Sequence, residues 1–226
     1  MARIVKSGGT LGVPAAKPPS FGTLGAGVSD AWGNVYAMSC SHVLAAPGGG
    51  SAAGAVVESP AQPGQQPGSE TIGSVYRWTG LGPGDNFVDA ALALVSVGVQ
   101  LSNAALALSF QQTAIHQQVP DFARYYGHTA RVHTARGELR GRIGHVYDHK
   151  IFTAGGRDYS FSSVLAYDAL DGPFEAGDSG SAVVEDTTGE FLGIHFAADD
   201  NGQAGYCILS CLIWRDFSAF ALQFVA

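Results

Sequence analysis

Residues 177–181 read Gly177-Asp178-Ser179-Gly180-Ser181, and three apolar residues follow them directly. Glycines on both sides of a serine allow a tight turn that exposes the hydroxyl group. The same turn can direct neighbouring backbone N–H groups at one point, where they would stabilise a developing oxyanion. We therefore predict that Ser179 is a nucleophile and that the N–H groups of Gly177 and Ser179 form an oxyanion hole.

Short strand-like runs separated by glycine-rich turns follow one another through most of the chain, which has 226 residues and 31 glycines. With 46% hydrophobic and 14% charged residues, it can bury a large core. Because all-β units of this length often form one domain, we predict an all-β fold and a single domain spanning residues 1–226. The expected strands are residues 34–39, 55–58, 72–78, 90–97, 130–133, 138–146, 164–167, 181–185, 191–196 and 205–210.

Three further segments are expected outside these strands. Residues 46–68 hold four of the ten prolines and many glycines, so they should form surface loops around one strand. Residues 104–118 have mixed helix-like character and separate the two halves of the chain. Residues 212–224 carry aromatic and aliphatic side chains at helical spacing, which predicts a closing helix.

A serine nucleophile needs an imidazole base and a carboxylate that orients it. His42 follows a strand-like run and is the predicted base. Asp89 leads into an apolar run, where an acid has little structural reason to lie unless it is paired, and it is the predicted orienting acid. Asp85 is the alternative, although it stands in a Gly-Pro-Gly-Asp turn where aspartate is common.

The nucleophile loop and the runs after it resemble those of trypsin-like serine proteases, closest to compact bacterial and glutamyl-endopeptidase-like members. The resemblance extends loosely through most of the chain, and the order His42, Asp89, Ser179 is that of the trypsin-like clan. It implies two six-stranded antiparallel β-barrels, about residues 1–110 and 120–226, with a C-terminal helix and the active site between the barrels. An α/β-hydrolase would need alternating parallel strands and helices, which the sequence does not show.

Two departures from the family pattern concern the activation and the base. The residues before His42 are Ser39-Cys40-Ser41, where the family usually has two alanines. Arg3-Ile4-Val5 resembles an activation cleavage site whose new amine would pair with Asp178, but the glycines that usually follow come late. An arginine from the second half of the chain is the alternative partner for Asp178.

The resemblance also implies where substrate side chains bind. Pro173, Phe174 and Glu175 should form one wall of the primary pocket, and His195, Phe196 and Ala197 another. His195 is similar to the histidine by which glutamyl endopeptidases hold an acidic side chain. The alternative is that His195 is a core residue on its strand, and both hypotheses stay open.

The charge and the cysteines restrict partners and location. A net charge of −7 argues against binding to nucleic acids or anionic membranes. No stretch is long enough for a membrane span, and no secretory signal precedes the chain as written, so we expect a cytoplasmic protein. The cysteines are Cys40, Cys207 and Cys211, and we expect free thiols and neither a metal nor a cofactor.

The function that these residues favour is a serine endopeptidase acting on protein or peptide substrates through an acyl-enzyme. A protease inside cells needs narrow specificity or control, so a regulatory protein partner is expected. Two alternatives remain: a pseudoprotease that uses the same fold for binding proteins, and an esterase-type acyl hydrolase.

Overall fold

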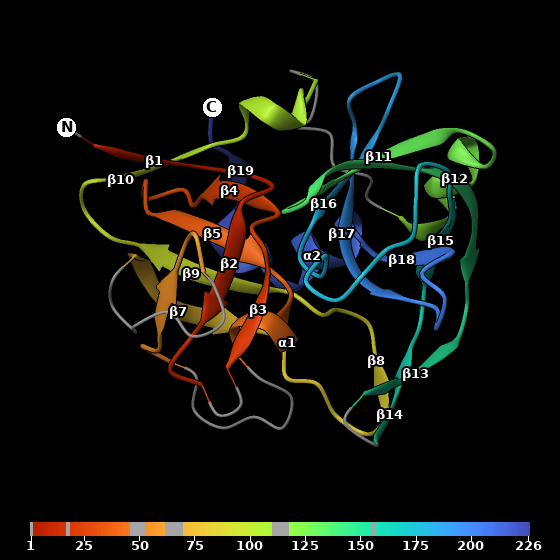
Figure 1. Ribbon diagram of the computed structural model, residues 1–226, viewed down its shortest axis with the longest axis horizontal. Helices are drawn as coiled ribbons and strands as arrows, with labels where there is room; N and C mark the ends of the chain where they lie inside the picture. The colour runs from red at the N-terminus through yellow and green to blue at the C-terminus, as the bar shows by residue number, and fades with distance from the viewer. Residues whose placement is uncertain (1, 17–18, 46–52, 62–69, 110–117, 155–156) are drawn as a thin grey trace.

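The structure is a computed structural model, and it describes residues 2–16, 19–45, 53–61, 70–109, 118–154 and 157–226. Two β-rich bodies lie side by side, one built from the N-terminal half of the chain and the other from the C-terminal half (Figure 1). Helices are few and short. The prediction of an all-β fold is therefore confirmed.

The N-terminal body is an eight-stranded sheet. Across the sheet, its strands are β19 (Gln223–Phe224), β4 (Ala26–Ser29), β5 (Val35–Ser39), β9 (Ala91–Val95), β7 (Thr71–Trp78), β6 (Val56–Glu58), β2 (Thr10–Val13) and β3 (Ser20–Thr23). Only Leu24 and Gly25 separate β3 from β4 in the chain, although the two strands lie near opposite ends of the sheet. The sheet must therefore curl back on itself, with β3 and β4 acting as one bent strand of a six-stranded barrel whose ladder is not fully closed.

The C-terminal body is a closed barrel of six strands. They are β11 (Thr129–Thr134), β12 (Gly137–Tyr147), β15 (Val164–Ala169), β18 (Ala204–Leu209), β17 (Phe191–Ala198) and β16 (Ala182–Glu185), each antiparallel to its neighbours. Leu192 and Ile194 are fully buried in this barrel. Closure leaves none of these six strands with an unpaired edge, which makes the barrel a rigid base for the loops at its end.

Two small sheets complete the described structure. β1 (Arg3–Lys6) pairs in parallel with β10 (Val99–Ser102). In the other sheet, the hairpin of β13 (Lys150–Ala154) and β14 (Arg157–Phe161) comes from the C-terminal half, whereas β8 (Asp85–Asn86) comes from the N-terminal half. The amide of Asn86 donates to the Ser160 carbonyl at 3.0 Å. This sheet therefore ties the two bodies together (Figure 1).

All ten predicted strands are present, within a few residues of the expected bounds. The closing helix was predicted too long: α2 spans Ser210–Asp216, a 3-10 turn covers Ser218–Phe220, and the chain then becomes β19. The physical reason is the left-handed conformation of Ala221 (φ +48°), which redirects the chain so that its last apolar residues pack on β4 of the other body. Among the described residues, no helix is long and apolar enough to cross a membrane.

The two loop predictions are tested only in part. Residues 46–52 and 62–69 lie outside the described residues, and β6 is the expected strand between them. In the segment between the bodies, 3-10 turns cover Ala104–Leu106 and Val119–Tyr125, and residues 110–117 lie outside the described part.

Candidate active site

The loop that carries Ser179 turns sharply because two of its residues are glycines with positive φ, Gly177 at +100° and Gly180 at +97°. Residues with a β-carbon rarely adopt these angles. At Gly180 a β-carbon would also collide with the Ser39 hydroxyl and the Thr23 carbonyl. The two glycines are thus required by the turn, and Gly180 also by its close approach to the N-terminal sheet.

Thr23 fixes the nucleophile loop from the opposite body. Its backbone N–H donates to the Ser179 carbonyl at 2.8 Å, and its hydroxyl donates to the Gly177 carbonyl at 2.9 Å. The Ser39 hydroxyl in turn donates to the Thr23 carbonyl at 2.7 Å. The position of Ser179 therefore depends on contacts between the two bodies, and not on the C-terminal barrel alone.

The predicted oxyanion donors are free in this loop. The backbone N–H groups of Asp178, Gly180 and Ser181 all donate to carbonyl groups of the protein. Those of Gly177 and Ser179 have no acceptor among the described residues. Two N–H groups without partners, that of the nucleophile candidate itself and that of the residue two positions before it, are what an oxyanion hole requires.

Asp178 is 1% exposed and is held by Arg136 from the turn between β11 and β12. Arg136 Nη2 donates to Asp178 Oδ2 at 2.7 Å, and Nε donates to Oδ1 at 3.2 Å. The N–H of Glu175 donates to the same carboxylate at 2.8 Å. The structure thus supplies the arginine partner that was the alternative to a new N-terminus, while Ile4 lies within β1.

His42 and Asp89 come together because the strands next to them are paired. His42 lies in α1 (Ser41–Leu44), directly after β5, and Asp89 precedes β9, which is the neighbour of β5. His42 Nδ1 lies 2.5 Å from Asp89 Oδ2, and the His42 backbone N–H donates to Asp89 Oδ1 at 3.1 Å. The alternative acid, Asp85, is exposed and accepts a hydrogen bond from Ser160 instead.

Opposing effects act on the imidazole of His42. Burial disfavours its charged form, but the negative charge of Asp89 and the hydrogen bond between them outweigh this, so the pKa of His42 is raised. Asp89 is 1% exposed. The pair therefore fixes Nδ1 as the protonated ring nitrogen when His42 is neutral, and leaves Nε2 to accept a proton.

The hydroxyl of Ser179 donates to the Phe196 carbonyl at 3.2 Å, and no hydrogen bond joins it to His42 among the described residues. The loops that carry these two residues nonetheless share a neighbour, Gly22. The Ser179 carbonyl and the Val43 side chain both lie against Gly22, where a β-carbon would stand 2.5 and 2.6 Å from them.

Two cavities open beside these residues. The first, which we call the primary cavity, has a volume of about 480 Å³. Ser179 lies in its lining together with Phe174 and His195, two of the predicted pocket residues. The second, about 500 Å³, has His42 and Asp89 in its lining. Phe196, which was predicted for the primary pocket, lines this second cavity with Phe152, Tyr159, Phe161 and Tyr206.

His195 is 2% exposed and closely held. Its Nδ1 lies 2.6 Å from the Tyr167 hydroxyl, and its ring centroid lies 5.0 Å from that of Phe174. The pKa of His195 is lowered to about 4: burial lowers it most, the charge of Asp178 opposes this in part, and the charge of His42 adds a smaller lowering. The imidazole in the primary cavity is therefore neutral at pH 7.

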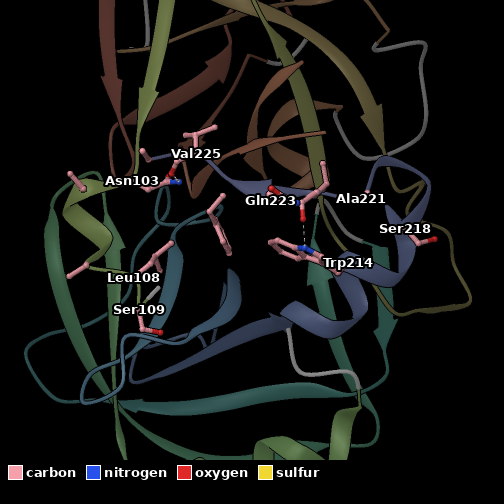
Figure 2. Close-up of a pocket in the computed structure, with 13 residues that line it drawn as sticks. Asn103, Leu108, Ser109, Trp214, Ser218, Ala221, Gln223 and Val225 are labelled. Carbon is pink, nitrogen blue, oxygen red and sulfur yellow. Dashed lines mark hydrogen bonds between the residues drawn. The ribbon is translucent and has the colours of Figure 1, made fainter. Parts of the chain in front are cut away.

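A cavity of about 840 Å³ lies away from these residues, between residues 103–109 and the C-terminal segment (Figure 2). Trp214 lines this cavity and donates from Nε1 to the Leu222 carbonyl at 3.0 Å. Its described lining contains serines but no histidine, aspartate or glutamate. It therefore lacks the base that a serine nucleophile needs.

One group of possible metal ligands occurs at the site. Donor atoms of Cys40, His42 and Asp89 lie within 4.8 Å of one another. Cys40 is fully buried, however, and its thiol donates to the His195 carbonyl at 3.3 Å, while the other two residues bind each other. Because every donor already has a protein partner, we assign Cys40 a packing role.

Sequence reasoning did not identify Thr23, Arg136 and Tyr167, the residues that hold the predicted site in place. Tyr167 precedes His195 by 28 positions, and the two meet only because both lie on barrel strands that flank β18. Arg136 stands in a turn with no local pattern of its own. No signal in the sequence marks these three partners, since each is set by tertiary contacts.

Solved bacterial serine proteases share this fold over almost the whole chain. A Nocardiopsis protease is 14% identical, with a TM-score of 0.64 over 99% of this chain and 100% of that one. A Cellulomonas bogoriensis chymotrypsin is 16% identical, with a TM-score of 0.60 over 98% of each chain. A serine protease described as specific for glutamic acid, and as using a histidine triad in substrate binding, is 12% identical, with a TM-score of 0.64 over 98% of this chain and 100% of that one.

No family model and no curated protein matches the sequence. Identities of this size establish the fold, and the fold is the chymotrypsin fold that the resemblance of the nucleophile loop implied.

Proposed function

We propose that this protein is a serine endopeptidase in which Ser179, His42 and Asp89 act as a catalytic triad. The observation that carries the proposal is the pair of His42 and the buried Asp89, 2.5 Å apart, whose loop lies against Gly22 together with a glycine-flanked serine that has two unpartnered N–H groups beside it. Each group needed for acyl transfer has a residue in this arrangement.

The reaction begins when Ser179 Oγ attacks the carbonyl carbon of the scissile bond and His42 Nε2 takes its proton. The oxyanion of the tetrahedral intermediate accepts hydrogen bonds from the N–H groups of Gly177 and Ser179. The intermediate then expels the amine, which receives the proton from His42, and an acyl-enzyme remains. Water, deprotonated by His42, hydrolyses this ester and regenerates the Ser179 hydroxyl.

Asp89 remains ionised throughout and stabilises the imidazolium that forms twice in each cycle. Before the first step the Ser179 hydroxyl has to leave the Phe196 carbonyl and turn to His42. Catalytic hydrogen bonds are often long or misaligned without substrate, and a bound peptide that pairs with the strand of Phe196 would compete for this carbonyl.

The specificity and the location follow from separate observations. One cavity lies beside Ser179 and another beside His42, so two substrate side chains can be bound at once, which supports narrow specificity. The three cysteines are free and buried, which fits a reducing compartment. We propose an intracellular endopeptidase on these grounds.

The preference of the glutamic-acid-specific neighbour is not carried over to this chain. That protein is described as using three histidines in substrate binding. Among the described residues that line the primary cavity here, His195 is the sole histidine. A single neutral imidazole is a weak partner for a carboxylate.

A fluorophosphonate probe tests the proposal, because it labels a serine only when a base and an oxyanion hole activate it. We expect the wild-type protein to be labelled and Ser179→Ala to remain unlabelled. Ser181→Ala is a matched control, since Ser181 lies two residues away in the same loop and is fully buried. An unlabelled wild type would favour a binding module on this fold, and labelling of Ser179→Ala would exclude Ser179 as the nucleophile.

Paired substrates separate the endopeptidase from an esterase. A peptide amide and the ester of the same sequence place the same side chains in both cavities. We expect cleavage of both, with the amide hydrolysed at a rate that depends on the residues flanking the bond. Hydrolysis of the ester alone would contradict the proposal.

A further inference from the structure

The primary cavity combines one neutral ring with several carboxylates. Its described lining includes Ser179, His195 and three acidic residues, Glu175, Asp199 and Asp200. Arg136 lies near one edge, where it pairs with Glu175 at 3.1 Å, but it is also committed to Asp178. Lysine and arginine are absent from the described lining. The cavity therefore carries negative charge at its rim and no free positive charge.

His195 presents one particular atom to this cavity. Nδ1 is taken by the Tyr167 hydroxyl, and Phe174 lies against the ring, so the imidazole cannot turn. Nε2 has no hydrogen-bond partner among the described residues, and it is not one of the fully enclosed polar atoms that lack partners. Because His195 lines the cavity and is only 2% exposed, Nε2 is a polar contact deep in the cavity.

The ring is neutral when substrate binds. Burial lowers the pKa of His195 to about 4, and a second positive charge close to His42 would be unfavourable. A neutral imidazole with Nδ1 engaged offers either one donor or one acceptor at Nε2, depending on which partner holds the proton.

We infer that the primary cavity selects a glutamine side chain, immediately before the bond that is cleaved, by hydrogen bonding its amide to His195 Nε2 and to the acidic rim. This inference rests on the proposed endopeptidase function. A primary amide has a carbonyl acceptor and two N–H donors, so it satisfies Nε2 in either tautomer. Its remaining N–H groups can donate to carboxylate oxygens of Glu175, Asp199 or Asp200.

Other side chains fit this chemistry less well. Glutamate has the shape of glutamine, but its carboxylate would be buried next to a neutral ring and three like charges. An apolar side chain of similar length would leave Nε2 without a partner. A lysine would find carboxylates at the rim but only a weakly basic nitrogen at depth. Asparagine is one methylene shorter and reaches less far toward a ring that is 2% exposed.

The experiment compares four peptides that differ only at the residue before the scissile bond, which is Gln, Glu, Met or Lys. The wild-type protein is assayed for kcat/KM, and Ser179→Ala is assayed for Kd with the same peptides. We expect Gln to exceed Glu by at least about 100-fold in kcat/KM, since a site built to hydrogen bond one group rejects an analogue that cannot pair. The order of Kd values should be the same.

A conservative variant tests the role of the ring. Tyr167→Phe removes the hydroxyl that fixes Nδ1, and the preference for Gln over Glu should fall by about tenfold. Tyr36→Phe is the matched control, because Tyr36 is also buried and its hydroxyl donates to Asp30 at 2.8 Å, in the N-terminal sheet. It should leave the preference unchanged.

The outcomes separate the inference from the proposed function. Cleavage with Glu equal to or better than Gln, or with Met or Lys equal to Gln, overturns the inference and leaves the endopeptidase in place. If no peptide is cleaved and no probe labels Ser179, the proposed function fails, and the Kd values still decide the inference: equal binding of the Gln and Glu peptides by Ser179→Ala overturns it.

Discussion

The N-terminal sheet and the C-terminal barrel each place a histidine beside one of the two cavities, and the pKa values of the two imidazoles are shifted in opposite directions. His42 faces the carboxylate of Asp89, whereas His195 faces the phenol of Tyr167. Burial disfavours the charged form of both rings, but only His42 has an anion close enough to reverse that effect. The pKa of His42 is raised, and that of His195 is lowered to about 4.

The partner of each ring therefore matches its role, and the ring beside the carboxylate, His42, is also the more exposed of the two. A ring beside a carboxylate can hold a proton during a reaction, so it can serve as a base. A ring beside a phenol stays neutral and serves as a fixed hydrogen-bonding group. Under the proposed function the two bodies have different roles: the N-terminal sheet supplies the charged pair, and the C-terminal barrel supplies the nucleophile, the oxyanion donors and the neutral contact in the cavity.

Replacing the anion of the N-terminal pair gives the largest expected effect. Asp89→Asn keeps the size of the side chain but removes its charge and favours the wrong tautomer of His42. We expect kcat to fall by about 10⁴-fold, as in other triads of this geometry. The raised pKa of His42 should also return toward its ordinary value, so activity against pH should begin to rise at lower pH than in the wild type.

Asp85→Asn is the matched control for this change, since Asp85 is the nearby aspartate that the turn sequence also offered. It should leave kcat within a few-fold of the wild type. A larger loss of kcat in Asp85→Asn than in Asp89→Asn would contradict the assignment of Asp89 as the partner of His42.

The partner of Asp178 gives the next largest effect, and it tests the C-terminal barrel. Arg136→Met leaves a carboxylate that is 1% exposed with only a backbone N–H as its partner. We expect a loss of about 3 kcal/mol in the free energy of unfolding, because an unpaired buried charge is costly. Probe labelling of Ser179 should weaken as well, since Asp178 anchors the nucleophile turn. Urea denaturation and the labelling rate measure the two effects.

Arg140→Met is the matched control, because it shows how much stability is lost when a different arginine in the same region is replaced. Arg140 also pairs with an aspartate, Asp171 at 2.8 Å, but both side chains are partly exposed. Exposed pairs contribute little, so the loss should be below about 1 kcal/mol. An equal decrease in the free energy of unfolding for the two variants would show that the burial of Asp178 does not determine the size of the effect.

The sequence predicts ten of the 19 described strands and the residues proposed here to carry the chemistry, for reasons that lie in local patterns. The strands over 191–196 and 205–210 have short apolar runs ended by turn residues, and those patterns are local. Ser179 is marked by its glycines, and Asp89 by an acid placed before a buried strand. His42 is found because small residues and a strand precede it.

The structural features that the sequence does not predict depend on contacts between distant segments of the chain. The short strands β8 and β19 have no pattern of their own and exist because β14 and β4 offer them partners. The helix predicted over 212–224 ends early for the same reason, since pairing with β4 overrides helical spacing. Phe196 alternates away from His195 along its strand, and this places it in the second cavity instead of the first.

The different partners of the two histidines also predict a pH dependence of stability that should have opposite signs for the two rings. The unfolded chain binds a proton at His195 near pH 6.5, whereas the folded chain does so near pH 4, so the contribution of the neutral ring is complete above pH 6.5 and is lost as the pH falls toward 4. The full loss amounts to roughly 3 kcal/mol. For His42 the folded pKa is the higher one, so its contribution is present below pH 6.5 and is lost as the pH rises through the folded pKa.

Urea denaturation of the wild type, His195→Gln and His42→Gln at a series of pH values measures both contributions as differences, in which the other titrating groups cancel. Relative to the wild type, His195→Gln should lose less stability on acidification from pH 7 to pH 4.5. His42→Gln should show its largest deficit at low pH instead. If the free energy of unfolding changed with pH in the same way in both variants, Asp89 and Tyr167 would not give the two rings different pKa values. The different roles proposed for the two histidines would then have no electrostatic basis.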